Sequence, residues 1–315
     1  MTGVVAFAAL ASLIDLHRVE TGTLVIYTTP ALRDVLEDSI LPAFEARTGR
    51  AVLPVYLAAG EEYYRVQLSP DRPEADLFLH ASPMFIEKGH AAGYLEVFNH
   101  THESDLPGDR SRTEGAGHFW YAFAWSPLVE VYHPRLGAPP DLANAEVRYG
   151  LPHPVLSNNG VYVALFFEET DPAAGQRAIG RAIVQTVNAR TNIAAIAGGS
   201  FDLTLGYEAV VRFFQAQGAK VAQAVPIIDG RTVTTPVVFS VGLVDGHPHA
   251  GAEVFIDHLF SRPVQDRLGE YYLRPVRPGS PDPPHALDLS ASEWIEYDWS
   301  QWKTLEASLG LYEVN

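Results

Sequence analysis

Apolar residues recur along this chain in short runs that alternate with amphipathic stretches, and the first such unit shows the pattern most clearly. The run from Leu24 to Tyr27 is apolar and β-branched, which predicts a buried β-strand. Thr29 and Pro30 follow as an N-cap and a first helical residue, and apolar residues then recur at helical spacing. This helix is expected to end at Gly49.

The same order of strand, short turn and helix recurs twice in the next segment. A strand at 51–57 leads into a helix that opens at 58–61, and a strand at 75–79 leads into a helix capped by Ser82 that closes around Gly93. Because the carboxyl ends of parallel strands meet at one edge of a sheet, the three turns should lie together. The sequence therefore predicts a ligand site at this edge.

The remaining pattern predicts further strands and helices. Extended segments are expected at 119–125 and 129–132, and loops at 99–117, 136–142 and 275–284. Strands are expected at 147–151, 201–205, 221–228 and 232–244, and helices at 161–169, 173–187, 192–197, 207–217, 250–260 and 292–309. The alternation predicts the α/β class.

We expect two lobes, each a mixed sheet flanked by helices, with a ligand cleft between them. Lobe 1 should comprise residues 22–125 and 235–290, and lobe 2 residues 126–234. Residues 291–315 should form a closing helix that packs on lobe 1. Two extended crossings, near 124–128 and 232–237, would join the lobes, and their closure would complete the site.

The first residues allow two interpretations. Residues 3–14 are apolar, and Ala9-Leu10-Ala11 is typical of a signal-peptide cleavage site, but no Lys or Arg precedes them. Residues 1–21 are therefore either a signal-peptide remnant or an ordinary N-terminal helix. This apolar run is too short to span a bilayer.

Composition excludes several classes of site and partner. The chain has 315 residues, 47% of them hydrophobic, which is enough for a large core. It has no Cys, which excludes disulfides and thiolate zinc sites. A formal net charge of -16 disfavours nucleic acid and anionic membrane as partners.

Neutral hydrogen-bond donors stand at the starts of several expected elements. They are Thr28, Thr29, Ser82, Ser126, Asn159 and Tyr207. Such donors, together with helix N-termini, can hold a tetrahedral oxyanion without a counter-charge. Each also has a purely structural alternative, as a helix cap, a turn residue or a packed ring. Arg190 is either an anion clamp or half of an ion pair.

Catalytic and metal motifs are not evident. The chain contains no Gly-x-Ser-x-Gly, P-loop or dinucleotide fingerprint. His100, His102, His247 and His249 fall in expected loops without the helical spacing of a zinc hydrolase. We therefore expect no metal, no cofactor and no enzyme activity. An enzyme on the same scaffold remains the rival class, since fold does not fix function.

The order of several sequence segments along the chain resembles that of the type II periplasmic solute-binding proteins of ABC importers. The resemblance covers roughly residues 22–278. In the first part of the chain the matching segments are Leu24–Thr29, Phe44–Gly49, Ala75–Phe78 and Gly93–Leu95. In the last part they are Pro236–Gly242, His249–Ile256 and Leu273–Val276. The family implies a monomer outside the cytoplasm, in the periplasm or at the cell surface, whose partners are a small ligand and a membrane permease.

Within that family the chain looks closest to the molybdate and tungstate binders. Asp229–Thr234 leading into Pro236 resembles their return strand, and Tyr207 falls where they have a ligand-contacting tyrosine. The resemblance adds candidate contacts at Gly60, Glu61, Gly160 and Thr191. Glu61 replaces the usual serine, and Ser157-Asn158-Asn159 stands where one branch has carboxylates, so the anion itself stays open.

Ferric-iron binders are the second branch that the chain resembles. They place paired tyrosines in the second lobe, whereas this chain has Tyr207 alone and no Glu in the turn 80–82. Small organic ligands, such as a phosphonate or a thiamine-like cation, are the other alternative. The predicted function is capture of a small oxyanion for an ABC importer.

Overall fold

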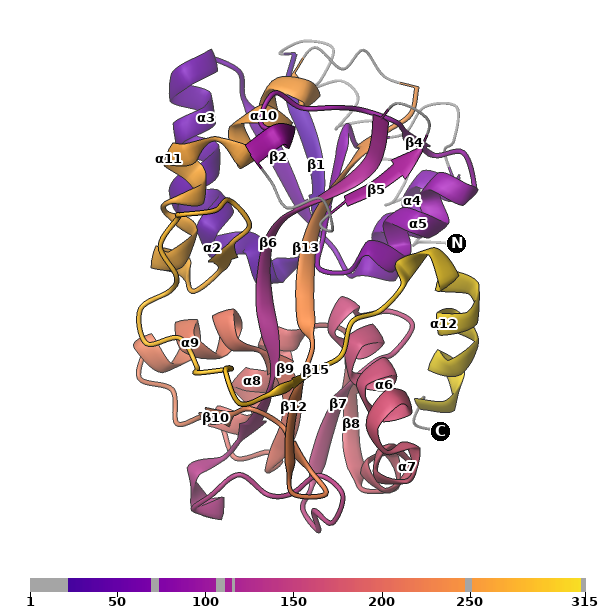
Figure 1. Cartoon of the computed structure of the whole chain (residues 1–315), viewed down its shortest axis with the longest axis vertical. Helices are drawn as coiled ribbons and strands as arrows, with labels where there is room; N and C mark the ends of the chain where they lie inside the picture. The colour runs from indigo at the N-terminus through magenta and orange to yellow at the C-terminus, as the bar shows by residue number, and fades with distance from the viewer. Residues whose placement is uncertain (1–21, 69–73, 106–110, 115–116, 247–250, 313–315) are drawn as a thin grey trace, which may run out of the picture.

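The computed structural model describes residues 22–68, 74–105, 111–114, 117–246 and 251–312 (Figure 1). The expected N-terminal segment at residues 1–21 and the histidines His247 and His249 lie outside this part of the chain. Within it, no helix combines the length and the apolar character needed to cross a membrane.

Two α/β lobes share one continuous path of strands, in the order β2-β1-β3-β13-β6-β9-β7-β8 (Figure 1). In the first lobe, β1 (Leu24–Thr28) lies between β2 (Val52–Tyr56) and β3 (Leu77–His80), and all three are parallel. In the second lobe, β7 (Tyr149–Pro152) pairs in parallel with β8 (Ala182–Thr186) and β9 (Leu203–Tyr207). The two-lobed mixed α/β class predicted from the sequence is confirmed.

One long strand runs through both lobes, and it changes partners where two prolines lie opposite each other. β6 (Gly117–Tyr132) and β13 (Pro236–Val244) are antiparallel, with Pro127 opposite Pro236. Before this point β6 pairs with β13, and after it β6 pairs with β9. Because proline has no N–H, no ladder hydrogen bond can form between the two prolines. The chain passes between the lobes where Pro127 lies opposite Pro236.

Short strands complete the two sheets and form a third. They are β4 (Leu95–Glu96), β5 (Ser111–Glu114), β10 (Ala222–Ala224) and β14 (Arg274–Pro275). A separate three-stranded sheet contains β11 (Ile227–Ile228), β12 (Arg231–Thr234) and β15 (Glu293–Trp294). Asp229 and Gly230 both have positive φ, which makes the turn between β11 and β12 a tight hairpin.

The first helical segment has the predicted caps but an irregular interior. Thr29 caps it and Gly49 ends it in the left-handed conformation, with φ 68°. Its pieces are η1 (Pro30–Leu32), α2 (Arg33–Val35), the π-helical η2 (Leu36–Ile40) and α3 (Leu41–Thr48). Pro42 has no amide hydrogen to bond the carbonyl one turn earlier, which accounts for the π-helical turn before it.

Three longer helices of the first lobe follow the predicted pattern, and three short helical segments were not predicted. α5 (Pro83–Ala91) begins at Ser82, whose side chain accepts a hydrogen bond from the amide of Met84. The rest are α4 (Ala59–Leu68), α10 (Ala252–Phe260), α11 (Arg262–Gln265), η3 (Glu103–Asp105) and η5 (Leu268–Tyr271). They cover the sheet whose central strand, β1, is buried along its whole length.

The second lobe has helices α6 (Asn158–Thr170), α7 (Pro172–Gly180), α8 (Ala189–Ala197) and α9 (Glu208–Ala216), with η4 (Pro134–Leu136). The predicted helix over 173–187 is wrong in its second half. α7 ends at Gly180, and the β-branched residues Ile183 and Val184 belong to the edge strand β8. Its parallel pairing with β7 outweighs the helical pattern.

Three other predictions are also corrected. The extended segments at 119–125 and 129–132 are one unbroken strand, β6. Part of the predicted loop at 99–117 is the strand β5, which pairs with β6. The closing helix begins at residue 302 instead of 292, because Glu293 and Trp294 add a strand to β12.

The C-terminal segment contacts both lobes, although the sequence places it on the first lobe. It consists of η6 (Trp299–Gln301), α12 (Trp302–Leu309) and η7 (Gly310–Tyr312). α12 packs against α5 of the first lobe and α6 of the second (Figure 1). Gln176 of α7 also donates a hydrogen bond to the carbonyl of Leu311, at 3.0 Å. This segment therefore bridges the lobes.

Candidate ligand site between the lobes

A small cavity lies where the two lobes meet. The first lobe lines it with the turn after β1 (Thr29–Ala31) and the turn after β2 (Leu57–Ala59). The second lobe contributes the start of α6 (Ser157–Asn159), the start of α8 (Val187–Arg190) and Tyr207. Its volume is about 10 Å³, which leaves room for about one water molecule. The lobes are thus closed on each other, and a larger ligand enters only as they part.

Helix N-termini surround this cavity, because α4, α6 and α8 all begin at its wall. The starts of α8 and α9 are capped from within the protein: Asn188 accepts from the amide of Thr191 at 2.9 Å, and Ser126 accepts from that of Ala209 at 3.1 Å. At α6, by contrast, the N-cap Ser157 makes no side-chain hydrogen bond. The first amides of α6 are therefore available to an anion.

Three side chains predicted from the sequence to contact ligand line the cavity. They are Thr29, Asn159 and Tyr207. Asn159 donates its side-chain Nδ2 to the carbonyl of Leu205 at 2.9 Å, while its Oδ1 is buried and without a hydrogen-bond partner. The hydroxyl of Tyr207 is also buried without a partner. Burial, and then the nearby Tyr162, raise the pKa of Tyr207 well above its usual value, so this side chain stays a neutral phenol.

No carboxylate belongs to the described residues that line the cavity. Arg190 lies at its edge and forms an ion pair with Asp34 of α2, across the two lobes. The guanidinium carbon of Arg190 also lies 4.6 Å from the centroid of the Phe213 ring. The sequence left Arg190 as either an anion clamp or half of an ion pair. In this closed arrangement it is half of an interlobe ion pair.

Two buried titratable side chains form a close pair in the first lobe. Glu62 and His80 are fully buried, with their Oε2 and Nε2 atoms 3.0 Å apart. Burial, followed by the charge of Glu61, raises the pKa of Glu62 well above its usual value. Burial lowers the pKa of His80 to about 3, partly offset by a hydrogen bond with Asn158. Both shifts favour the uncharged form of the side chain.

Three predicted hydroxyls serve the fold in this structure. Thr28 donates to the carbonyl of Leu79 at 3.3 Å, Ser82 accepts from the amide of Met84 at 3.3 Å, and Ser126 caps α9. All three side chains are fully buried, and none of them lines the cavity.

The other four predicted positions also lie outside the lining. The amide of Gly60 approaches the carbonyl of Leu156 in the other lobe at 3.5 Å. Glu61 is exposed and pairs with Arg65 at 3.0 Å. At Gly160 an added Cβ would lie 2.1 Å from a backbone oxygen, so only glycine fits there. Thr191 is exposed and bonds to the cap of α8. Ligand contact at all ten positions stays a prediction.

The cavity also has lining residues that the sequence did not single out. Ser157 and Asn158 stand beside a predicted contact, in the polar turn before α6. Asn188 was missed because the sequence predicted this helix to begin at 192, four residues after its true cap. An N-cap signal does exist there, as Asn188 is followed by helix-forming residues.

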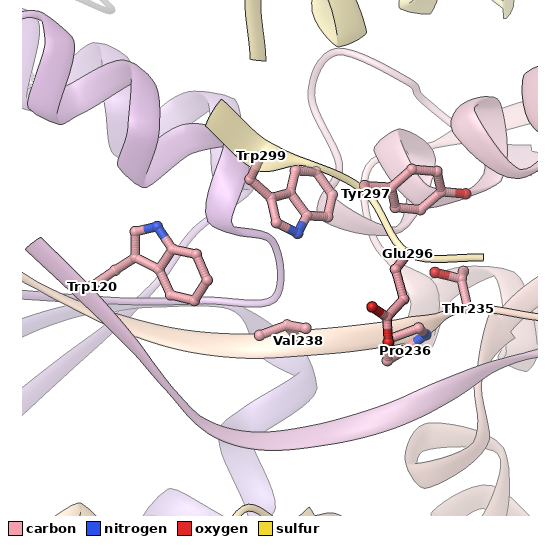
Figure 2. Close-up of a pocket in the computed structure, with 7 residues that line it drawn as sticks. All are labelled: Trp120, Thr235, Pro236, Val238, Glu296, Tyr297 and Trp299. Carbon is pink, nitrogen blue, oxygen red and sulfur yellow. The ribbon is translucent and has the colours of Figure 1, made fainter. Parts of the chain in front are cut away.

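A second cavity of about 80 Å³ lies at the lobe crossing (Figure 2). Thr235, Pro236 and Val238 come from the passage between the lobes, and Glu296, Tyr297 and Trp299 from the C-terminal segment; Trp120 completes the lining. Figure 2 shows the Trp120 and Trp299 rings on either side of the open space above Val238. None of the predicted ligand contacts lies here.

The histidines at 100–103 pack within the first lobe. His100 stacks on Phe260 with ring centroids 4.1 Å apart, and burial lowers its pKa to about 4. In the described part of the chain, no group of three or more His, Asp or Glu side chains is placed to hold a metal ion.

Comparison with known families decides the class of protein. The sequence profile of the bacterial extracellular solute-binding proteins matches residues 24–274, which is most of the chain. This chain belongs to that family. No curated protein matches it. The resemblance predicted from the sequence is thereby confirmed at the level of the family.

Solved structures of other solute-binding proteins share the fold. AfuA from Actinobacillus pleuropneumoniae, with fructose-6-phosphate bound, has a TM-score of 0.78 at 17% identity, covering 92% of this chain and 96% of its own. Iron-bound HitA from Pseudomonas aeruginosa has a TM-score of 0.74 at 16% identity, covering 92% and 98%. A periplasmic thiamin binding protein has a TM-score of 0.73 at 16% identity, covering 92% and 95%.

These comparisons establish the fold and the general role but not the ligand. The matched structures bind a sugar phosphate, iron and, by name, thiamin, and at such low identity they are evidence for the fold alone. The family consists of binding proteins that act outside the cytoplasm, so this solute-binding protein is not an enzyme and has an extracytoplasmic role.

Proposed function

We propose that this solute-binding protein captures a small tetrahedral oxyanion between its lobes and delivers it to the membrane permease of an ABC importer. The observation that carries the proposal is the start of α6, whose first residues line the cavity and whose first amides have no side-chain cap. Amides at a helix N-terminus, with the positive end of the helix dipole behind them, form a natural anion site.

The rest of the lining supports an anion rather than a cation. Thr29 and Tyr207 bring neutral hydroxyls, and no described lining residue is a carboxylate. A neutral, hydrogen-bonding cavity suits an oxyanion even in a protein of net charge -16, because the donors act at short range while the surface charge is screened. Molybdate and tungstate, which the sequence resemblance favours, belong to this ligand class.

Iron and organic solutes are less well supported. Ferric iron requires several hard anionic oxygens, whereas this cavity has one tyrosine and no carboxylate among its described lining residues. Pockets for organic ligands usually enclose about 300 to 1,000 Å³. The closed cavity here has about 10 Å³, so a small ion requires far less parting of the lobes.

The proposal is tested by a thermal-shift panel on dialysed protein. The ligands are molybdate, tungstate, sulfate, phosphate, a phosphonate, ferric citrate and thiamine. A ligand that binds only the folded state raises the melting temperature by mass action. We expect a saturable increase with at least one oxyanion and none with thiamine. An increase with ferric citrate or thiamine alone would contradict the proposal.

Recognition by the permease and the monomeric state belong to the same proposal. A permease would recognise the closed state, in which elements of both lobes form one surface. Size-exclusion chromatography with light scattering should give a mass near 34.5 kDa for the monomer. A stable larger species would contradict the monomeric state but not the ligand class.

A further inference from the structure

The residues that line the cavity carry buried hydrogen-bond acceptors with no donor in the described part of the chain, and the amide oxygen of Asn159 is one of them. Asn159 stands in the first turn of α6 and is 1% exposed. Its Nδ2 donates to the carbonyl of Leu205 at 2.9 Å, and this contact fixes which amide atom points away from Leu205. The remaining atom, Oδ1, is buried without a partner, on a residue that lines the cavity.

An unpaired acceptor has consequences for an anion bound beside it. A buried polar atom without a partner destabilises the state that contains it. If every oxygen of the ligand is an acceptor, Oδ1 stays unpaired and also repels the ion. A ligand with one hydroxyl instead donates to Oδ1 while its other oxygens accept from Tyr207 and from the amides of α6. Asn159 and Tyr207 thus complement an ion that has both kinds of group.

We infer that the ligand is a protonated oxyanion, in which Asn159 accepts a hydrogen bond from an acidic hydroxyl of the ion. Hydrogen phosphate and hydrogen arsenate belong to this class. Sulfate, selenate, molybdate and tungstate have no hydroxyl near pH 7 and lie outside it. This inference rests on the proposed function, and it makes Asn159 the residue that distinguishes between oxyanions of the same shape.

The hydroxyl donor could come from inorganic hydrogen phosphate or from a phosphate monoester. Both can present a protonated oxygen on phosphorus, but a monoester, whose second pKa is about 6, keeps that proton in only a minor fraction near pH 7, whereas inorganic phosphate always keeps one. The cavity favours the inorganic ion, because a volume of about 10 Å³ leaves no space for an organic substituent unless the lobes part widely. Glycerol 3-phosphate is therefore the comparison ligand that distinguishes the two sources.

The test uses pairs of ions that match in size and shape and differ in the proton. Dialysed protein is titrated by calorimetry near pH 7 with phosphate and sulfate, and then with arsenate and selenate. A site built to pair with a ligand hydroxyl rejects analogues without it by roughly 10⁴- to 10⁵-fold in favourable cases. We expect phosphate and arsenate to bind at least about 100-fold more tightly than their partners.

Two variants assign the preference to Asn159. Asn159→Leu removes Oδ1, and we expect the ratio of phosphate to sulfate affinity to fall toward one. Asn192→Leu is the matched control, because Asn192 is fully buried in the same lobe but bonds to Thr186 at 2.8 Å and does not line the cavity. This control should keep the wild-type ratio. If Asn159→Leu does not fold, the comparisons of phosphate with sulfate and of arsenate with selenate still decide the inference on the wild-type protein.

The outcomes separate this inference from the proposed function. Equal affinities within a pair, or tighter binding of sulfate or molybdate, overturn the inference while oxyanion capture stands. An unchanged ratio in Asn159→Leu overturns the role of Asn159. Tighter binding of glycerol 3-phosphate than of phosphate overturns the inorganic source alone. If no oxyanion binds at all, the proposed function fails together with the inference.

Discussion

The hydroxyl of Tyr207 offers a test in which binding and stability should change in different ways. In the ligand-free protein it is buried without a hydrogen-bond partner, so Tyr207→Phe removes no internal hydrogen bond. The ring packs edge-on against Phe239, with centroids 5.9 Å apart, and a phenylalanine keeps that contact. The melting temperature of the ligand-free variant should therefore equal or exceed that of the wild type.

The expected loss of affinity follows from the hydrogen bond that the Tyr207 hydroxyl would donate to the bound ion. A hydrogen bond from a neutral donor to a charged group contributes about 1.5 to 3 kcal/mol, and each 1.4 kcal/mol is about a tenfold change in affinity. Tyr207→Phe should therefore weaken binding of the oxyanion about 10- to 150-fold, measured by titration calorimetry. Affinity equal to that of the wild type would show that this hydroxyl does not contact the ion.

Tyr162 is the matched control for the effect on stability. Its hydroxyl accepts a hydrogen bond from the amide of Val238 at 2.9 Å, in the strand that leaves the lobe crossing. Tyr162→Phe leaves that amide buried without a partner, which should lower the free energy of unfolding by about 1 to 3 kcal/mol. If the two variants lower the melting temperature equally, Tyr207 has an internal partner and the reasoning fails.

Three further predictions concern the lobe contact, the start of α6 and a buried carboxyl. Gly160→Ala should abolish binding and lower the melting temperature, because its Cβ would lie 2.1 Å from a backbone oxygen, whereas Gly180→Ala meets nothing within 4 Å and should fold normally. Asp34→Asn removes the interlobe partner of Arg190 and should shift the ligand-free protein toward the open form by up to about fivefold, seen as a larger radius of gyration in small-angle scattering; an unchanged radius would contradict this. Burial raises the pKa of Glu130 from 4.5 to about 8, so its contribution to stability is complete below pH 4.5 and is lost as the pH rises through about 8. Glu130→Gln should therefore melt like the wild type at pH 5 and clearly above it at pH 9, and a constant difference in melting temperature would be evidence against the raised pKa.

Local signals in the sequence predicted much of the fold. Thr29, Ser82 and Gly49 occupy the caps expected of them, because a cap depends on residues within one turn of the chain. The strand at Ala182–Thr186 was predicted as helix, because its assignment depends on pairing with β7, about thirty residues away. The bridging position of α12 has the same origin, since a sequence does not show which surfaces its apolar side chains will meet.

The candidate site shows the same limit more sharply. A hydroxyl that follows a strand can cap a helix or bind a ligand, and the sequence is the same in both cases. Thr29 both caps its helical segment and lines the cavity, whereas Ser82 and Ser126 only cap helices, α5 and the distant α9. Only the opposing backbone decides between these roles. Two of the three turns that the sequence placed together, those after β1 and β2, line the cavity, and the turn after β3 does not.

The most direct test of the account is a calorimetric titration of the dialysed wild-type protein with phosphate near pH 7. Oxyanion capture predicts saturable binding of one ion per chain, at a site that Tyr207→Phe weakens. It is contradicted if neither phosphate nor any other oxyanion binds while ferric citrate or thiamine does. That result would show that the protein binds another class of solute.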